Sequence, residues 1–445
     1  MNASEGYRGR IPFRALQLTL EEQERCQELT LQLLDRTLRS YDERDATTNG
    51  TPRHTPRHHS NLDNARWKRH KTQENASLYS ERNHGGRRDL HMPGDNWESP
   101  AVLLAVGNIQ ASLDDVMFGL TTQTFGDVRV RAASIASHDV SGATLAKLSG
   151  PTEEDPFQSL SVMWMVGEQV WPLSMIVRPR DFVILSASGV FTRSNGERIG
   201  YDLVQPAQLP QLHELPKPMT RGKLMYGALY RELQDGTVDV YIQMYVETKG
   251  YVLDAIVMNA MWIAVLGFWE APRLSQEKKL QWCILNSMNN SNNRQNRATA
   301  GTWANMSFCS ICKDKLRRFS RGREHLPSAN NSCAVCATLL CSKCRVKRSF
   351  KVLTGQSKGS PTRSIHVGVC QVCLTFVDHQ SAAEIAWQQT QQRLMHSDES
   401  TDSNRPTWGL LDDIVTPSWT PGQYFSISEA SFSFSDCDMR STHSA

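Results

Sequence analysis

The sequence predicts an α+β chain: a curved antiparallel sheet covered by a long apolar helix, then a small cross-braced two-zinc finger and a disordered tail. Three observations carry this prediction. Runs of alternating polar and apolar residues between positions 65 and 275 are typical of strands. Residues 252–269 are apolar on nearly every helical face. Eight cysteines between positions 309 and 373 form four Cys-x-x-Cys pairs.

Changes in composition divide the 445 residues into seven segments. Apolar residues at helical spacing after Thr19, with Glu21 and Glu22 close behind, predict a capped helix near the N-terminus. An Asn- and Ser-rich stretch before the first cysteine pair predicts a linker, and a Ser-, Asp- and Pro-rich end predicts disorder. The expected segments are an N-terminal helical segment (1–45), a flexible loop (46–64), the sheet domain (65–280), a linker (281–302), the zinc finger (303–377), a helix (378–396) and an acidic disordered tail (397–445).

Strands and one helix make up the predicted sheet domain. Asn195-Gly196 supplies a hairpin turn between two of the strands. The helix places Ile256, Ala260, Ile263 and Leu266 on one stripe and carries further apolar residues around it, so it needs cover on nearly all faces. It is therefore expected to pack across the sheet and to close off an interior. The clearest alternating runs are 161–166, 182–186 and 238–245.

The order of these elements, with Arg180-Asp181-Phe182-Val183 in their middle, resembles the START family of lipid-transfer and lipid-sensing domains. Lys249-Gly250 before the helix and Asn259 within it add to the resemblance, although Leu253 replaces a common Pro. The resemblance implies a helix-grip fold whose C-terminal helix lids an apolar tunnel for a lipid. Candidates for the tunnel wall are Trp164, Arg180, Tyr245, Ile256 and Trp262.

Two simpler interpretations of these candidates stay open. Arg180 and Asp181 can form a structural pair at a strand end. The large aromatic residues Trp164, Tyr245 and Trp262 can be ordinary core, because aromatic side chains dominate cores as well as cavities. Periodicity alone does not separate a packed core from a lined tunnel.

The cysteine spacing predicts two metal sites. Two cysteines separated by two residues can turn back on one metal ion, and two such pairs complete a tetrahedral zinc site. Only four residues separate the second pair from the third, too few for these pairs to share one metal comfortably, so alternate pairs are expected to do so. The predicted cofactors are two Zn²⁺, one held by Cys309, Cys312, Cys341 and Cys344 and the other by Cys333, Cys336, Cys370 and Cys373.

All-cysteine ligation with a short central gap resembles the FYVE family of phosphoinositide-binding fingers, and Trp303 stands where that family has the Trp of its Trp-x-x-Asp motif. This sequence lacks the residues with which that family binds the lipid headgroup. The family's basic motif falls on Ala-Asn-Asn-Ser-Cys-Ala at 329–334, its acid on Met306 and a further Arg on Gly368. These side chains cannot make the charge-assisted bonds that a phosphomonoester needs. The resemblance implies a membrane-associated scaffold, on endosomes or other membranes, without specific recognition of phosphatidylinositol 3-phosphate.

The predicted finger is strongly basic, with thirteen Lys and Arg against two acidic residues over 303–377. A solvated surface is the plain interpretation of such charge runs. The alternative is attraction to an acidic membrane or an acidic protein, worth about 1 kcal/mol per basic residue near an anionic surface. Because the rest of the chain is net acidic, no specific nucleic-acid partner is expected. The basic surface is expected to contain Lys313, Lys315, Arg317, Arg318, Arg345, Lys347 and Arg348.

Other features limit the class of protein. The N-terminus has no charged-then-apolar signal, no apolar run reaches about 18 residues, and the three remaining cysteines lie far apart, which favours a cytoplasmic compartment. Closed zinc sites and the absence of nucleotide-binding or hydrolase motifs argue against an enzyme. The patterns favour a peripheral lipid-binding protein. The alternative is a zinc-finger adaptor whose START-like fold holds no ligand; a ubiquitin ligase is third, because the Cys-x-His of RING fingers is missing.

Overall fold

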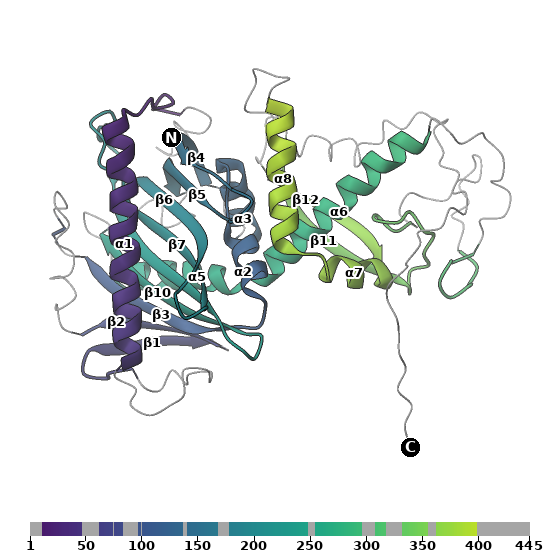
Figure 1. Ribbon diagram of the computed structural model, residues 1–445, viewed down its shortest axis with the longest axis horizontal. Helices are drawn as coiled ribbons and strands as arrows, with labels where there is room; N and C mark the ends of the chain where they lie inside the picture. Colours follow the sequence, from purple (N-terminus) through teal and green to yellow (C-terminus); the bar gives the residue numbers. More distant parts are fainter. Residues whose placement is uncertain are drawn as a thin grey trace.

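The computed structural model describes residues 11–46, 62–73, 75–82, 97–98, 100–136, 140–167, 178–247, 254–295, 308–316, 332–354 and 362–397. Residues 398–445 of the predicted tail and 47–61 of the predicted loop lie outside these ranges. The described chain forms a sheet domain and a smaller cysteine-rich finger, and helix α6 (Ala271–Gln295) runs from one into the other (Figure 1). Within the described ranges, no helix is both long and apolar enough to cross a membrane.

One large sheet dominates the sheet domain. Its strand order is β1-β2-β3-β10-β9-β7-β6-β5-β4, with antiparallel neighbours, and β8 pairs in parallel with β6. The strands are β1 (Trp67–Gln73), β2 (Ala76–Glu81), β3 (Ala101–Ile109), β4 (Val140–Ser149), β5 (Ser159–Gly167), β6 (Arg180–Thr192), β7 (Arg198–Pro206), β8 (Thr220–Arg221), β9 (Lys223–Glu232) and β10 (Val238–Glu247). The turn predicted at Asn195-Gly196 joins β6 to β7, and Gly196 takes the positive φ of 83° there.

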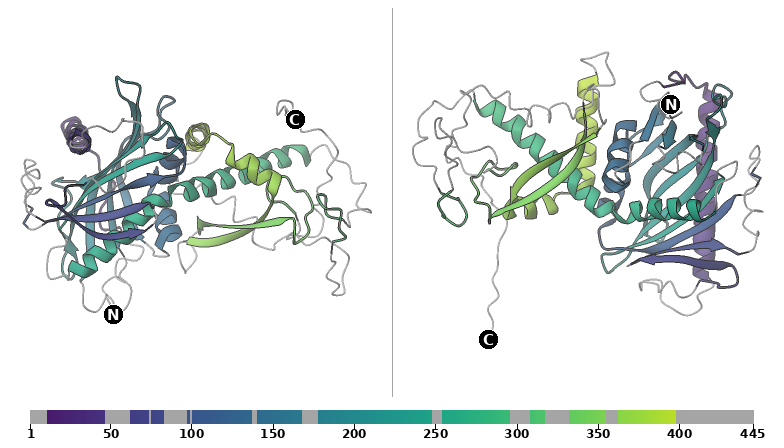
Figure 2. Two further views of the ribbon diagram at one scale, coloured as in Figure 1. Left: turned by 90° about the horizontal axis from the view of Figure 1, so that it is seen from below. Right: turned by 180° about the vertical axis from the view of Figure 1, so that it is seen from behind.

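Helices cover both faces of this sheet. One face lies against α1 and is called the α1 face; the opposite face, called the α5 face, lies against α2, α3 and α5 (Figure 2). The helices are α1 (Leu20–Ala46), α2 (Leu113–Leu120), α3 (Phe125–Ala136), α5 (Asp254–Trp269), α7 (Gln371–Asp378) and α8 (Ala382–Ser397), in addition to α6. The predicted α+β helix-grip class is therefore confirmed.

Helix α1 begins at the predicted capping residue. The backbone N–H of Glu22 donates to Thr19 Oγ1 at 3.2 Å, and the N–H of Thr19 donates to Glu22 Oε2 at 2.9 Å, which forms a reciprocal capping box. Leu33 and Tyr41 of this helix are buried in the core of the α1 face. The N-terminal helix is thus part of the sheet domain and not a separate segment.

Helix α5 buries a different stripe from the predicted one. Trp262, Val265 and Phe268 lie in the core of the α5 face, whereas Ala260 and Ile263 are exposed, Ile263 at 40%. A helix that is apolar all round gives no periodic signal to tell its covered side from its free side. The sequence could therefore not show which stripe faces the sheet.

The predicted linker at 281–302 is wrong for residues 281–295, which continue helix α6, and its remaining residues lie outside the described ranges. Lys279 Nζ pairs with Asp115 Oδ1 of α2 at 2.7 Å. Lys278 Nζ donates to the carbonyl oxygens of Phe118 and Thr121, at 2.6 and 2.8 Å, at the C-terminal end of α2. These buried contacts fix α6 to the sheet domain. The Asn- and Ser-rich composition that suggested a linker begins only after the residues that make them.

The finger joins the sheet domain at a second place. Its hairpin consists of β11 (Arg345–Leu353) and β12 (Thr362–Cys370), which is followed by α7 and then by α8. Ala382, Ile385 and Ala386 of α8 are buried in the core of the α5 face, together with residues of α2, α5 and α6. Helix α8 accordingly stands between the two halves of the molecule (Figure 1). Both α6 and α8 tie the finger to the sheet domain.

Candidate metal centres and candidate ligand face

Each group of cysteines begins with a tight knuckle of the same backbone shape. The N–H of Lys313 donates to the carbonyl oxygen of Cys309 at 2.9 Å, and the N–H of Ala337 donates to that of Cys333 at 2.9 Å. Lys313 and Ala337 both take left-handed φ angles, 60° and 59°. The left-handed residue after the second cysteine turns the chain back, so both thiols of a pair can face one centre.

The structure gathers the eight cysteines into two groups of four. In each group the four sulfur atoms lie within 4.8 Å of one another. These are the groups that alternate pairing predicts, and each could hold one metal ion. Four sulfur donors in a closed set are typical of structural zinc. Site 1 consists of Cys309, Cys312, Cys341 and Cys344, and site 2 of Cys333, Cys336, Cys370 and Cys373.

Backbone N–H groups point at the sulfur atoms. The N–H of Cys344 donates to Cys341 Sγ at 3.4 Å, and the N–H of Cys373 donates to Cys370 Sγ at 3.3 Å. Burial raises the pKa of Cys309, but backbone N–H donors around it outweigh this effect and lower its pKa to about 6. The thiolate is the form that binds a metal ion, so these donors favour metal binding.

The two sites differ in how they are embedded. In site 1, Cys309 is buried, Cys312 is exposed and the other two cysteines are half-buried. In site 2, Cys333, Cys370 and Cys373 are buried, at 2%, 4% and 8% exposure. These three belong to the finger core, which also contains Leu280 and Ile284 of α6. Site 2 is thus built into the contact between the finger and α6, whereas site 1 touches the finger core only through the half-buried Cys344.

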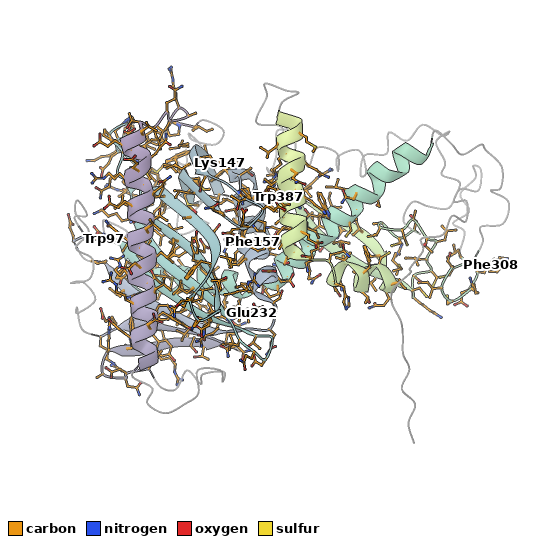
Figure 3. The ribbon with its side chains drawn as sticks, viewed as in Figure 1. Trp97, Lys147, Phe157, Glu232, Phe308 and Trp387 are labelled. Atoms are coloured by element: carbon orange, nitrogen blue, oxygen red, sulfur yellow. The ribbon has the colours of Figure 1, made fainter. Side chains whose placement is uncertain are left out.

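The outer surface of the first knuckle combines basic and apolar side chains. Lys313, Lys315 and Lys343 are exposed, and Phe308 and Ile311 are 53% and 47% exposed. Phe308 lies at the end of the finger that is far from the sheet domain (Figure 3). The two apolar residues were not among the predicted site residues, although their position beside a cysteine pair in a basic segment is a signal that the sequence contains. Among the other predicted basic residues, Lys347 and Arg348 are exposed, Arg345 is half-buried against Gly368, and Arg317 and Arg318 lie outside the described ranges.

The structure does not bring the five predicted tunnel residues together. Trp164 and Tyr245 lie in the core of the α1 face, whereas Trp262 lies on α5 in the core of the opposite face. Ile256, also on α5, is half-buried. Side chains alternate between the two faces of a strand, so one residue of register decides the face. The sequence showed the strands but not which alternate set faces α5.

Arg180 and Asp181 are neighbours in sequence but have different partners. Asp181 is fully buried, accepts a hydrogen bond from Trp164 Nε1 at 3.1 Å, and pairs with Arg221 Nη2 at 2.9 Å. Arg180 donates from Nη1 to the carbonyl oxygen of Arg178 at 2.7 Å. Since Val183 belongs to the core of the α1 face with Trp164, strand alternation places Arg180 on the side of the α5 face. Asp181 is thus a structural residue of the α1 face.

Beneath α3, the α5 face carries an apolar patch that is incompletely covered. Met163, Ile184 and Val204 are buried there. Five side chains around them are only half-buried, and we call the eight together the α3 patch. Beneath α2, in contrast, Leu103, Leu113 and Met117 are completely buried. The half-buried members of the patch are Val128, Met165, Phe182, Leu224 and Tyr226.

A buried polar group lies beside this patch. The hydroxyl of Tyr226 donates to Asp202 Oδ1 at 3.2 Å, and burial raises the pKa of that carboxyl group. Tyr230 is completely buried, and its hydroxyl has no hydrogen-bond partner among the described residues. The pKa of Tyr230 is raised by burial first and by the charge of Asp202 second. Asp202, Tyr226 and Tyr230, the β7–β9 polar cluster, thus offer hydrogen-bonding capacity inside an apolar face.

Comparison with known proteins gives only distant structural neighbours. No family model matches the chain, and no curated protein matches its sequence. Human StAR-related lipid transfer protein 5 is similar with 13% identity and a TM-score of 0.36, over 57% of this chain and 98% of that chain. The lipid transfer and protein localization domain of human StarD13 gives 13% identity, a TM-score of 0.32 and coverages of 47% and 88%. Human STARD10 gives 11% identity, a TM-score of 0.30 and coverages of 48% and 78%.

Proposed function

We propose that this chain is a non-enzymatic, peripheral lipid-binding protein. One apolar lipid lies on the α3 patch of the sheet domain, and the zinc-loaded finger docks on an acidic membrane. The observation that carries the proposal is the set of half-buried apolar side chains beneath α3, among them Met165, Phe182 and Leu224. A lipid chain that covered them would gain about 0.8 kcal/mol for each methylene removed from water. The resemblance of the sequence to START domains agrees with this assignment.

The β7–β9 polar cluster gives the ligand a polar end. A buried hydroxyl that lacks a partner, such as that of Tyr230, costs about 1–3 kcal/mol. A ligand hydroxyl could accept from Tyr230 and donate to the carboxyl group of Asp202. The favoured ligand class is therefore an apolar molecule with one uncharged hydrogen-bonding head, such as a sterol or a long-chain alcohol.

Two substitutions at one position test the ligand site. Met165→Trp adds bulk at a half-buried position of the patch, whereas Met165→Leu keeps the volume almost unchanged. The full chain, purified from its own cells, should carry lipid in native mass spectra as wild type and as Met165→Leu. Met165→Trp should have lost most of that lipid while it keeps the same melting temperature within a few degrees. Equal lipid content in all three proteins, or none in the wild type, would contradict the ligand site.

The metal ions are proposed to be zinc and to be structural. Each site offers four thiol groups in a closed set, which leaves no ligand position for water or substrate. When it is bound, Zn²⁺ supplies only coordination that holds the knuckles together. The cysteines hold the metal, and the basic and apolar side chains of the first knuckle make the docking surface.

Docking by the first knuckle uses two contributions that can be separated. Phe308 and Ile311 supply apolar insertion, and Lys313 and Lys315 supply attraction to anionic headgroups, about 1 kcal/mol each. Sedimentation with vesicles that contain phosphatidylserine should give weaker binding for Ile311→Ala at every salt concentration. Lys315→Ala should weaken binding at low salt and matter less at high salt, because salt screens exposed charges. If the wild type binds neutral and acidic vesicles equally well, this docking mode is contradicted and a protein partner is favoured.

A further inference from the structure

Helix α3 lies between the proposed ligand face and the finger. On its inner side, Val128 packs on the α3 patch. Ile135 packs against Gly267 of α5 so closely that a Cβ atom at Gly267 would lie 3.1 Å from Ile135 Cδ1. The guanidinium of Arg131 lies over the ring of Phe268, 5.4 Å from its centroid. These contacts make α3 the cover of the patch and join it to α5.

The outer side of α3 is held by the finger. Gly126 faces Leu353 at the end of β11, where a Cβ atom on the glycine would lie 2.7 Å from Leu353 Cδ1. Asp127 Oδ1 lies 3.6 Å from Arg393 Nη2 of α8. Asp127 also caps α3, since it accepts from the backbone N–H of Thr124 at 2.9 Å. The same carboxyl group thus caps the N-terminus of α3 and meets helix α8, which follows the finger.

Site 2 lies at the base of both of these contacts. Cys370 ends β12, the partner strand of β11, and its sulfur accepts from the N–H of Cys373 in the first turn of α7. Only three residues separate α7 from α8, and the buried side of α8 enters the core of the α5 face. The cysteines of site 2 therefore help to position the elements that press on α3: β11 through its pairing with β12, and α8 through α7. β11 itself begins directly after Cys344 of site 1.

We infer that metal loading of site 2 holds α3 closed over the α3 patch, and that loss of this metal loosens the cover and speeds the exchange of a bound lipid. The part that concerns lipid rests on the proposed function; the hold on α3 does not. Site 1 has a weaker connection, because among its cysteines only the half-buried Cys344 packs against the finger core that contains Leu280 and Ile284. Zinc at site 1 orders the docking surface, and zinc at site 2 controls the ligand cover.

Hydrogen exchange of the full chain tests the hold on α3. Peptides that cover residues 125–136 should exchange about fivefold to thirtyfold faster in Cys370→Ser than in the wild type, the factor that a contact of one or two kcal/mol represents. Cys341→Ser, which removes the equivalent ligand of site 1, should leave their exchange unchanged. Equal exchange in the wild type and in Cys370→Ser would overturn the inference, as would equal acceleration by both substitutions.

A second pair of variants keeps all eight cysteines. Leu353→Ala removes the side chain that contacts Gly126, whereas Ile311→Ala shortens an exposed apolar residue of the first knuckle. With two metal ions bound in each, Leu353→Ala should accelerate exchange in α3 and Ile311→Ala should not. Unchanged hydrogen exchange of α3 in Leu353→Ala would show that the contact with β11 does not hold α3, and it would contradict the inference.

Release of a fluorescent probe tests the consequence for a ligand. The wild type, Cys341→Ser and Cys370→Ser are loaded with cis-parinaric acid, and its transfer to acceptor vesicles is followed. Release should be about tenfold faster from Cys370→Ser alone, in line with the exchange rates. Equal release rates would overturn the inference for a bound ligand. A wild type that does not bind the probe would contradict the proposed ligand site for this class of ligand. The hydrogen-exchange rates would then decide whether site 2 holds α3.

Discussion

The two candidate metal sites each consist of four cysteines in Cys-x-x-Cys pairs and begin with the same knuckle, yet they are embedded differently. Three cysteines of site 2 lie in a core shared with Leu280, Cys283 and Ile284 of α6. Site 1 lies toward the far end of the finger, where Phe308 and Ile311 are exposed. The difference implies different purposes for the two proposed metal ions: an ion at site 2 would join the finger to the sheet domain, and an ion at site 1 would order an exposed surface.

The two sites are expected to contribute differently to stability. A structural zinc site contributes binding free energy on the order of 10 kcal/mol to the fold that contains it. At site 1 that fold is the first knuckle and its neighbours. At site 2 it includes the hairpin β11–β12, α7 and, through Ala382 and Ile385 of α8, the core of the sheet domain. The two metals should therefore stabilise regions of different size.

The largest expected effect comes from a direct exchange of one ligand in each site. Cys370→Ser and Cys341→Ser should each reduce bound zinc from two to about one per chain, which metal analysis of the purified protein measures. Only Cys370→Ser should lower the melting temperature of the sheet domain, by about 5 °C or more, because it frees α8 and α3 as well as the finger. Near-ultraviolet circular dichroism follows this transition through buried aromatic residues such as Trp164. Equal shifts for both variants would remove the distinction between the sites.

A medium effect is expected from α8, the element that carries the influence of site 2 into the sheet domain. Ile385 is 3% exposed in the core of the α5 face, and Leu394 on the same helix is 60% exposed. Ile385→Ala should cost about 2–5 kcal/mol of unfolding free energy, as buried Ile-to-Ala changes do. Leu394→Ala should cost less than about 0.5 kcal/mol. Urea unfolding measures both; a small effect of Ile385→Ala would mean that α8 does not belong to the sheet domain.

The smallest expected effect is a local one at Cys283, which reports on the contact between α6 and the finger. Burial raises the pKa of this thiol to about 11 from an ordinary value of 9.0, so its thiolate is about a hundredfold scarcer at pH 8 than in an exposed thiol. Iodoacetamide should label it slowly in the wild type and in Cys341→Ser, and much faster in Cys370→Ser. Rapid labelling in the metal-loaded wild type would show that the contact is open.

The same pKa shift fixes the sign of a pH dependence. Between pH 9 and about 11 the folded chain keeps the proton of Cys283 while the unfolded chain has lost it. This thiol therefore makes the free energy of unfolding fall as the pH rises through that window. Cys283→Ala should remove this part of the slope, which urea unfolding at pH 9 and pH 10.5 can detect.

The sequence predicted the local structure well and the packing poorly. The capping box of Thr19 and Glu22, the turn at Gly196 and the alternate pairing of the cysteines depend on short-range spacing, which a sequence displays. The covered side of α5 and the face on which Trp164 lies depend on register and on distant neighbours.

The packing of the finger against the sheet domain was the feature that the sequence predicted least well. A polar stretch before the finger suggested a linker. The few apolar residues that join α6 to the finger core, Leu280 and Ile284, gave no signal of this contact, because about fifty residues or more separate them from their partners in the sequence. Likewise, Ile385 follows the finger in sequence but packs in the sheet domain. Periodicity reports which side of a helix is apolar and not which domain covers it.

Scanning calorimetry of the full chain, with and without a zinc chelator, tests the union of sheet domain and finger most directly. The account predicts one cooperative transition for the metal-loaded chain, because α6 contributes to both cores and α8, which follows the finger, packs in the core of the sheet domain. Removal of the metal should abolish the finger's contribution to the enthalpy and move the remaining transition to a lower temperature. Two separate transitions in the loaded chain, with the sheet domain melting at the same temperature after chelation, would contradict it.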